Sequence, residues 1–145
     1  MTEHVNLGNA RLDEQRNVME NIVQDGVCPF CPEHLERYHK QPILRSGDHW
    51  VLTSNQWPYE NTRMHLLAIA AYHAENLSDL RPGSMDELQK HFQWAEFTYK
   101  VAAGGLAMRF GDVMKNGATV NHLHAHFIVP EDNLPPDTKV RFKIS

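Results

Sequence analysis

Histidine occupies every second position in one short run of the chain, at His122, His124 and His126. In an extended strand, alternate side chains point to the same face and lie about 6.6–6.8 Å apart. A strand here would place the three imidazoles in one row and turn Leu123 and Ala125, which alternate with them, toward a core. Imidazole can act near neutral pH as a nucleophile, as a general acid or base, or as a metal ligand. The run therefore indicates a functional site on a rigid strand.

The histidine row itself has three interpretations. The strand could face solvent and carry its imidazoles without a role. The three imidazoles could bind a catalytic metal together, as in hydrolytic zinc centres. One imidazole could instead be a nucleophile.

Length and charge exclude several classes of protein. A chain of 145 residues favours one domain, residues 1–145, with a real core. The formal net charge of −4 gives no basic field for nucleic acid. Apolar runs are far shorter than the ~20 residues that span a bilayer, and the N-terminus lacks a signal-peptide pattern. We therefore expect a cytoplasmic protein with no membrane and no nucleic-acid partner.

Hydrophobic periodicity predicts an antiparallel α+β domain with two main helices. The first helix is expected over residues 9–24. The second begins near Ser84, where Ser84 and Glu87 have capping-box spacing, and runs to about residue 103, before two glycines. Strands are expected at residues 42–45, 49–53, 65–71, 106–110 and 122–129, with an edge strand at 140–144 in the tail 131–145.

The only two cysteines, Cys28 and Cys31, form a Cys-Pro-Phe-Cys knuckle. They could be half of a zinc site, a redox pair or two free thiols. Thioredoxin-like chemistry would place the pair at a helix start within a βαβ unit, and no such unit is predicted.

Two segments resemble the histidine triad (HIT) superfamily. The run His122-Leu-His-Ala-His-Phe-Ile is similar to its defining motif, His-φ-His-φ-His-φ-φ. The segment from His65 to His73 resembles the family pattern His-x-Leu-Val-Ile-Pro-Lys-x-His, with Ala70 in place of the usual proline. The loop beginning Asn55-Gln-Trp-Pro-Tyr is similar to the Asn-x-x-Pro-Tyr loop of the diadenosine-tetraphosphate phosphorylase-like branch.

The resemblance implies a HIT-like fold with a core at about residues 40–130 and a sheet extended across a homodimer. It also implies a nucleotide hydrolase or transferase acting on phosphoramidates or dinucleoside polyphosphates. His124 would attack the α-phosphorus and form a covalent nucleotidyl intermediate. His126 would stabilise the leaving group, and His65 would orient the pair. A phosphorolytic enzyme of the same kind is the second choice.

Further residues receive roles from this resemblance. Asn55 would bind a ribose hydroxyl, and the loop residues Asn116, Gly117 and Thr119 would supply donors to the phosphates. Gly111 stands where many members of the family carry an asparagine. The implied ligands of a structural zinc are Cys28, Cys31, His73 and His122.

Two functions from other classes stay open at this point. The chain could be a zinc-dependent hydrolase in which the three histidines bind a catalytic metal. It could also be a nucleotide-binding regulator without turnover.

Overall fold

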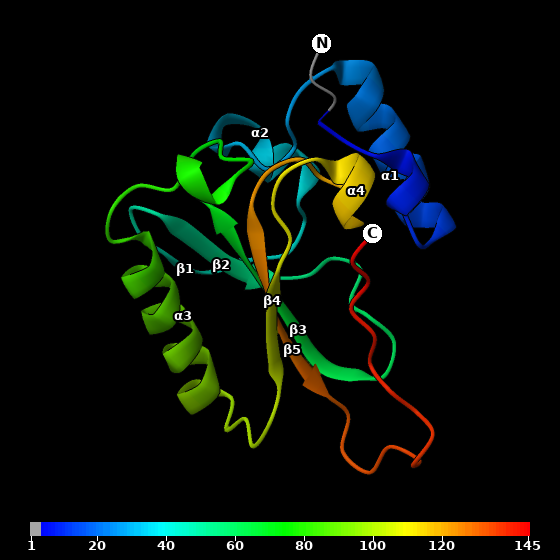
Figure 1. Cartoon of the computed structure of the whole chain (residues 1–145), viewed down its shortest axis with the longest axis vertical. Coiled ribbons are helices and arrows are strands. Elements are labelled where there is room, and N and C mark those ends of the chain that lie inside the picture. Colours follow the sequence, from blue (N-terminus) through cyan, green and yellow to red (C-terminus); the bar gives the residue numbers. More distant parts are fainter. Residues whose placement is uncertain (1–3) are drawn as a thin grey trace.

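A five-stranded antiparallel sheet forms the centre of the computed structural model, which describes residues 4–145 (Figure 1). The strand order is β1-β2-β3-β5-β4. The strands are β1 (Ile43–Ser46), β2 (Trp50–Ser54), β3 (Thr62–Ala70), β4 (Gly105–Met108) and β5 (His124–Pro130). The predicted α+β class with an antiparallel sheet is confirmed.

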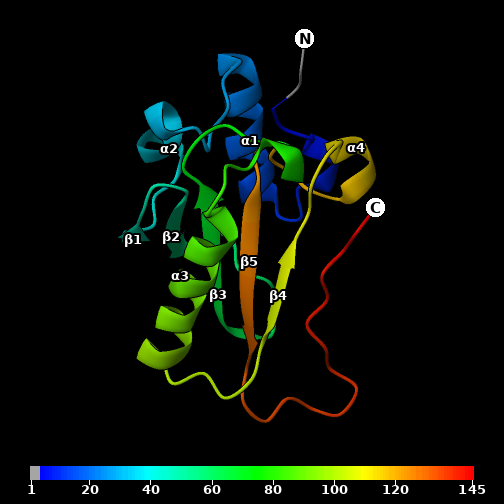
Figure 2. The ribbon, with the colours of Figure 1, turned by 60° about the vertical axis from the view of Figure 1, so that its left-hand side comes forward.

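The helices fall into two groups around this sheet. Helix α3 (Ser84–Thr98) lies alongside the strands, whereas α1 (Asp13–Asp25), α2 (Pro32–Tyr38) and α4 (Val113–Asn116) gather toward one end of the sheet (Figures 1 and 2). Short 3-10 turns occupy Leu7–Asn9 and Leu77–Asp79. Over residues 4–145, no helix is long and apolar enough to cross a bilayer.

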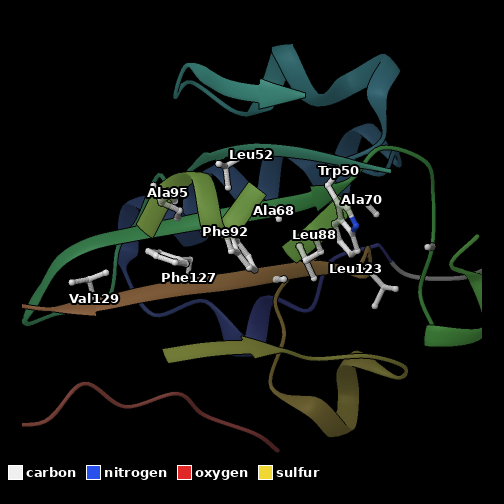
Figure 3. Packing of buried hydrophobic residues seen from close by; sticks show 13 residues of the cluster. Trp50, Leu52, Ala68, Ala70, Leu88, Phe92, Ala95, Leu123, Phe127 and Val129 are labelled. Atoms are coloured by element: carbon white, nitrogen blue, oxygen red, sulfur yellow. The ribbon is translucent and has the colours of Figure 1, made fainter. Parts of the chain in front are cut away.

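The alternation of β5 divides its side chains between two different environments. Ala125, Phe127 and Val129 enter the main core, where Leu88 and Phe92 of α3 pack against the sheet (Figure 3). His124 and His126 therefore belong to the other face. A second apolar cluster, built from Val5, Met19, Ile22 and Val120, is packed with Phe30, Tyr38 and Trp57.

The helix predicted at residues 9–24 and the strand predicted at residues 122–129 both begin later than expected. Residues 7–9 form a 3-10 turn before α1 starts at Asp13. Strand β5 starts at His124, so that His122 precedes it and is not part of a three-histidine strand. The ladder begins where Ile69 pairs with His124.

Helix α3 begins at Ser84, as predicted, but the capping box expected from Ser84 and Glu87 is absent. Gly83, at φ +89°, is the N-cap, and no side chain caps the helix. The Glu87 carboxylate instead accepts hydrogen bonds from the backbone N–H groups of His49 and Trp50, at distances of 2.7–3.2 Å. It therefore connects the helix to the β1–β2 hairpin. The helix also ends at Thr98, earlier than predicted, before Lys100 adopts a φ of +53°.

The predicted edge strand at 140–144 is absent, and this part of the tail has no regular structure. The carbonyl of Lys143 accepts a hydrogen bond from Arg109 Nε at 2.7 Å, and Lys143 Nζ donates to Asn9 Oδ1 at 3.1 Å. Side chains thus take the place of a strand ladder in holding the tail. Phe142 lies near the ring of His126, with 5.1 Å between the ring centroids.

Candidate functional site

His124 has one ring nitrogen held by the backbone and one left for chemistry. Its Nδ1–H donates to the carbonyl of His122 at 2.7 Å, which leaves the lone pair on Nε2. Burial lowers the pKa of His124 to about 4, against the opposing effect of the His122 carbonyl. The imidazole is therefore neutral at pH 7, which is the state in which it can act as a nucleophile.

A chain of hydrogen bonds assigns the opposite tautomer to His126. The backbone N–H of Tyr59 donates to His65 Nδ1 at 3.1 Å, so His65 carries its proton on Nε2. His65 Nε2 in turn donates to His126 Nδ1 at 2.7 Å. His126 is left with an N–H at Nε2, a buried atom that has no partner among residues 4–145. A buried donor without a partner is costly, which favours a ligand that accepts from it.

Both histidines of this hydrogen-bond chain are neutral. Burial lowers the pKa of His65 to about 3 and holds the pKa of His126 well below its ordinary range. The arginines Arg11 and Arg109 act in the same direction on both rings.

His124 and His126 line one cavity of about 110 Å³, and their ring centroids are 5.1 Å apart. Part of the wall is apolar and aromatic, with Met19, Ile22, Phe30 and Trp57. Another part is cationic, with Arg11, Arg109, Arg141 and Lys143. The apolar part of the wall thus suits an apolar group of a ligand, and the cationic part suits an anionic group.

Of the predicted substrate-binding residues, Asn55, Gly117 and Thr119 line this cavity and Asn116 does not. The Asn116 side chain holds its own loop: Oδ1 accepts from the N–H of Ala118, and Nδ2 donates to the carbonyl of Phe110. Gly111 does not line the cavity either, and its backbone N–H donates to the carbonyl of Glu75 at 2.8 Å. The loop therefore brings two of its three predicted residues to the cavity wall.

A separate cluster joins the cysteine knuckle to the histidines that flank the site. One donor atom from each of Cys28, Cys31, His73 and His122 lies within 4.8 Å of all the others. His122 Nδ1 is 3.3 Å from the Cys28 sulfur, and His73 Nδ1 is 3.2 Å from the Cys31 sulfur. Tetrahedral zinc with ordinary bond lengths separates such ligands by about 3.6 Å. The four residues fit a tetrahedral metal ion.

The far nitrogens of both histidines in this cluster have acceptors. His122 Nε2 donates to the carbonyl of Ala70 at 2.8 Å, and His73 Nε2 lies 2.9 Å from a Glu75 oxygen. Both rings therefore present Nδ1 as a lone pair, and such outer partners are typical of metal-bound histidine.

The cysteines are poorly suited to redox chemistry. Burial raises the pKa of Cys28 and raises that of Cys31 to about 12. A reactive cysteine needs a lowered pKa, whereas a bound cation would deprotonate these thiols outright.

The three histidines of the sequence motif are thus divided between the cysteine cluster and the cavity. His122 faces the cysteines, whereas His124 and His126 face the cavity. Within residues 4–145, the cluster around Cys28 is the only group of this kind that could hold a metal. The geometry does not support a catalytic metal shared by all three.

Sequence reasoning did not assign four residues that the structure brings to the site. The Arg11 guanidinium lies 4.6 Å from the centre of the Tyr59 ring, and that of Arg109 lies 3.9 Å from the Phe142 ring. Tyr59 had a signal, because it ends the Asn-x-x-Pro-Tyr pattern. The other three lie in segments predicted as a helix or a strand, where no motif marked them as residues of a site.

Comparison with known proteins agrees with this geometry. Residues 43–133 match the family model of the HIT domain. No curated protein matches the sequence significantly.

Several solved structures share the fold at low sequence identity. A HIT family hydrolase from Clostridium thermocellum is 21% identical, with a TM-score of 0.58 over 77% of this chain and 96% of that one. A zinc-bound histidine triad family protein from Mycobacterium smegmatis is 20% identical, with a TM-score of 0.57 over 81% and 84%. Diadenosine triphosphate hydrolase from Plasmodium falciparum, in complex with cyclomarin A, is 19% identical, with a TM-score of 0.51 over 63% and 62%.

Proposed function

The chain belongs to the HIT domain family, and on this premise we propose that it hydrolyses a nucleoside phosphate at the α-phosphorus through a nucleotidyl-His124 intermediate. One observation carries the proposal. The cavity presents a lone pair on His124 Nε2 beside an unpartnered N–H on His126 Nε2. A nucleophile next to a donor for developing negative charge is what phosphoryl substitution requires.

The first step joins the nucleotide to His124. The Nε2 lone pair attacks the α-phosphorus, and the bond from phosphorus to the oxygen or nitrogen of the leaving group breaks, a nitrogen leaving group also taking up a proton from solvent. The electron pair of that bond departs with the leaving group. The His122 carbonyl holds the Nδ1 proton and stabilises the positive charge that the ring gains. The His126 N–H donates a hydrogen bond to the oxygens that become negative.

The second step releases the nucleotide. Water attacks phosphorus, the bond from phosphorus to Nε2 breaks, and its electron pair returns to the imidazole. The products are a nucleoside monophosphate, a proton and neutral His124.

The residues that line the cavity support a placement for each part of the substrate. The apolar residues near Trp57 suit a base, which stacks on aromatic surfaces. Asn55 lies where it can bind a sugar hydroxyl, and Gly117 and Thr119 lie on the wall beside the reacting histidines. Asn116 supports these two residues through its loop bonds and takes no direct role.

We assign a structural zinc ion to the cluster of Cys28, Cys31, His73 and His122. Four protein ligands close a structural site and leave no open position for catalysis. His122 then has two roles, because its ring binds the metal and its carbonyl orients the nucleophile. The solved structure of a zinc-bound family member supports the assignment.

Steady-state hydrolysis tests the proposed reaction. The wild type should release nucleoside monophosphate from an adenosine 5′-phosphoramidate or from diadenosine triphosphate. We expect His124→Ala to lose at least about 10⁴-fold in kcat, because the nucleophile is gone. His34→Ala, a histidine outside the cavity, is the matched control and should keep full activity. Tight nucleotide binding without turnover would show a regulator instead.

Metal removal separates structural from catalytic zinc. Metal analysis should find one zinc per chain, and a strong chelator should lower the free energy of unfolding by about 4 kcal/mol, the linkage expected when free metal is ~1,000 times its Kd. At a temperature where the chelated protein is still folded, it should still form the His124 adduct. Complete loss of adduct with intact secondary structure would support a catalytic metal.

A further inference from the structure

Two arginines from distant parts of the chain meet around Tyr59. The Arg11 side chain, which also donates to the carbonyl of Trp57, lies over the Tyr59 ring at 4.6 Å. Arg109 Nη2 donates to the Tyr59 hydroxyl at 3.4 Å. We call Arg11 and Arg109 the arginine pair. Both belong to the wall of the cavity that holds His124 and His126.

The carboxylate that attracts Arg11, that of Glu60, lies outside the wall of the cavity. Over residues 4–145, neither guanidinium forms an ion pair, and no aspartate or glutamate lines the cavity. Partial burial lowers the pKa of Arg11, and repulsion from Arg109 acts in the same direction. Two like charges held together beside an unpartnered donor, in a chain of net charge −4, indicate an anionic ligand.

The arginine pair lies on the His126 side of the cavity. The Tyr59 ring stacks on His126, with 5.7 Å between centroids and 18° between planes, and the Phe142 ring lies near both Arg109 and His126. The aromatic neighbour of His124 is instead Phe30, which belongs to the apolar wall. The cation-rich side is therefore the one past which a leaving group would depart.

The hydrogen-bond chain through His126 also limits the leaving group. It begins at the backbone N–H of Tyr59 and passes through neutral His65, so that it has no spare proton. If His126 gave up its Nε2 proton, the chain would be left with an imidazolate. A group that departs as a stable anion needs only a hydrogen bond, whereas an amine must take up a proton to leave.

We propose that the arginine pair binds the phosphate chain of an anionic leaving group, so that the preferred substrate carries at least one phosphate beyond the attacked one. A dinucleoside polyphosphate has this character, and a nucleoside phosphoramidate does not. The proposal rests on the proposed function of the same site. Guanidinium groups bind phosphate oxygens through two hydrogen bonds at once, and their charge stabilises the negative charge that develops on departure.

Two substrates and three variants test this role. Diadenosine triphosphate and an adenosine 5′-phosphoramidate share the attacked phosphate and differ in the leaving group. For Arg11→Gln and Arg109→Gln, the ratio of kcat/KM for the triphosphate to that for the phosphoramidate should fall at least about tenfold, as expected for a lost charged hydrogen bond. Arg63→Gln removes the same charge from an exposed residue outside the cavity and should leave the ratio unchanged.

A parallel fall for both substrates would overturn the proposal, because it would place the pair at the attacked phosphate or in the stability of the fold. An unchanged ratio would overturn it as well. Binding of inorganic triphosphate, measured by calorimetry, needs no turnover and should weaken at least about tenfold in both variants. If the wild type hydrolysed neither substrate, the proposed function would fail, and this binding measurement would still decide whether the pair holds a phosphate chain.

Discussion

At the scale of single residues, the proposed chemistry depends on which nitrogen of each of three neighbouring imidazoles carries a proton. His124 and His126 lie two positions apart on one strand, yet their hydrogen bonds leave opposite nitrogens protonated. The difference arises from their partners, a backbone carbonyl for His124 and a histidine ring for His126. Residue type alone therefore does not define the roles.

Nitrogen-15 NMR of the histidine rings tests this assignment. At pH 7, long-range proton–nitrogen correlations should show Nδ1–H for His124 and Nε2–H for His65 and His126. Replacing His65 by glutamine should change the His126 pattern and leave that of His124 unaltered. An Nδ1–H on His126 in the wild type would contradict the hydrogen-bond chain.

Burial of His65 should make stability depend on pH. Its pKa falls from 6.5 to about 3 in the folded protein. Between these two values, the unfolded chain is protonated at His65 and the folded protein is not. The penalty is absent above about pH 6.5 and grows as the pH falls toward 3. Between pH 6 and 4, the free energy of unfolding in urea should fall with pH in the wild type and fall less steeply in His65→Gln. The two slopes should differ by up to about 1.4 kcal/mol per pH unit. Equal slopes would rule out this contribution.

At the scale of elements, Glu87 connects α3 to the β1–β2 hairpin. Burial alone would raise the pKa of Glu87, but hydrogen bonds from the N–H groups of His49 and Trp50 lower it overall. The carboxylate is thus ionised and accepts from two backbone donors, one of them on fully buried Trp50, while His91 Nε2 lies 3.3 Å from it.

We expect Glu87→Gln to lower the free energy of unfolding in urea by about 1–2 kcal/mol, because an amide accepts these bonds less strongly. Asp86→Asn is the matched control. It removes an exposed carboxylate from the same first turn of α3, and it should cost less than about 1 kcal/mol, the worth of a helix-dipole interaction. Equal losses in both variants would show that only the helix dipole matters.

Features set by neighbouring residues in the sequence could be predicted, whereas features set by contacts between distant segments could not. The alternation around His124 predicted its strand and the opposite faces of that strand, because side-chain period follows from backbone geometry. The capping box failed because Glu87 has partners in a hairpin nearly forty residues earlier in the chain. The contact between His65 and His126 depends on the register that pairs Leu67 with His126, which no local pattern encodes.

The whole molecule builds its site from both ends of the described chain. Arg11 precedes α1, Phe142 lies in the tail, and the contact between Lys143 and Asn9 joins the two segments beside the cavity. The HIT resemblance pointed to the histidines to which we assign the reaction and to the four residues that cluster as possible metal ligands. It did not extend to these segments, which lie outside the motifs.

At this scale, the homodimer and the cytoplasmic location stay predictions. The exposed edge of the sheet offers a test of the homodimer. Strand β4 is an edge of the sheet, and Leu106 on it is 63% exposed beside a cavity of about 520 Å³ that reaches α3. Light scattering after size-exclusion chromatography should give a dimer for the wild type and a monomer for Leu106→Glu. Ile43→Glu on the opposite edge should stay dimeric. A wild-type monomer would contradict the prediction.

The central claim is that His124 bonds to phosphorus while His122 serves the metal cluster. Protein mixed with diadenosine triphosphate, quenched in base within a turnover and digested should yield one modified peptide in tandem mass spectrometry. We predict a nucleotidyl group on His124 alone. A nucleotidyl group on His122 or His126, or full turnover by His124→Ala, would contradict the account.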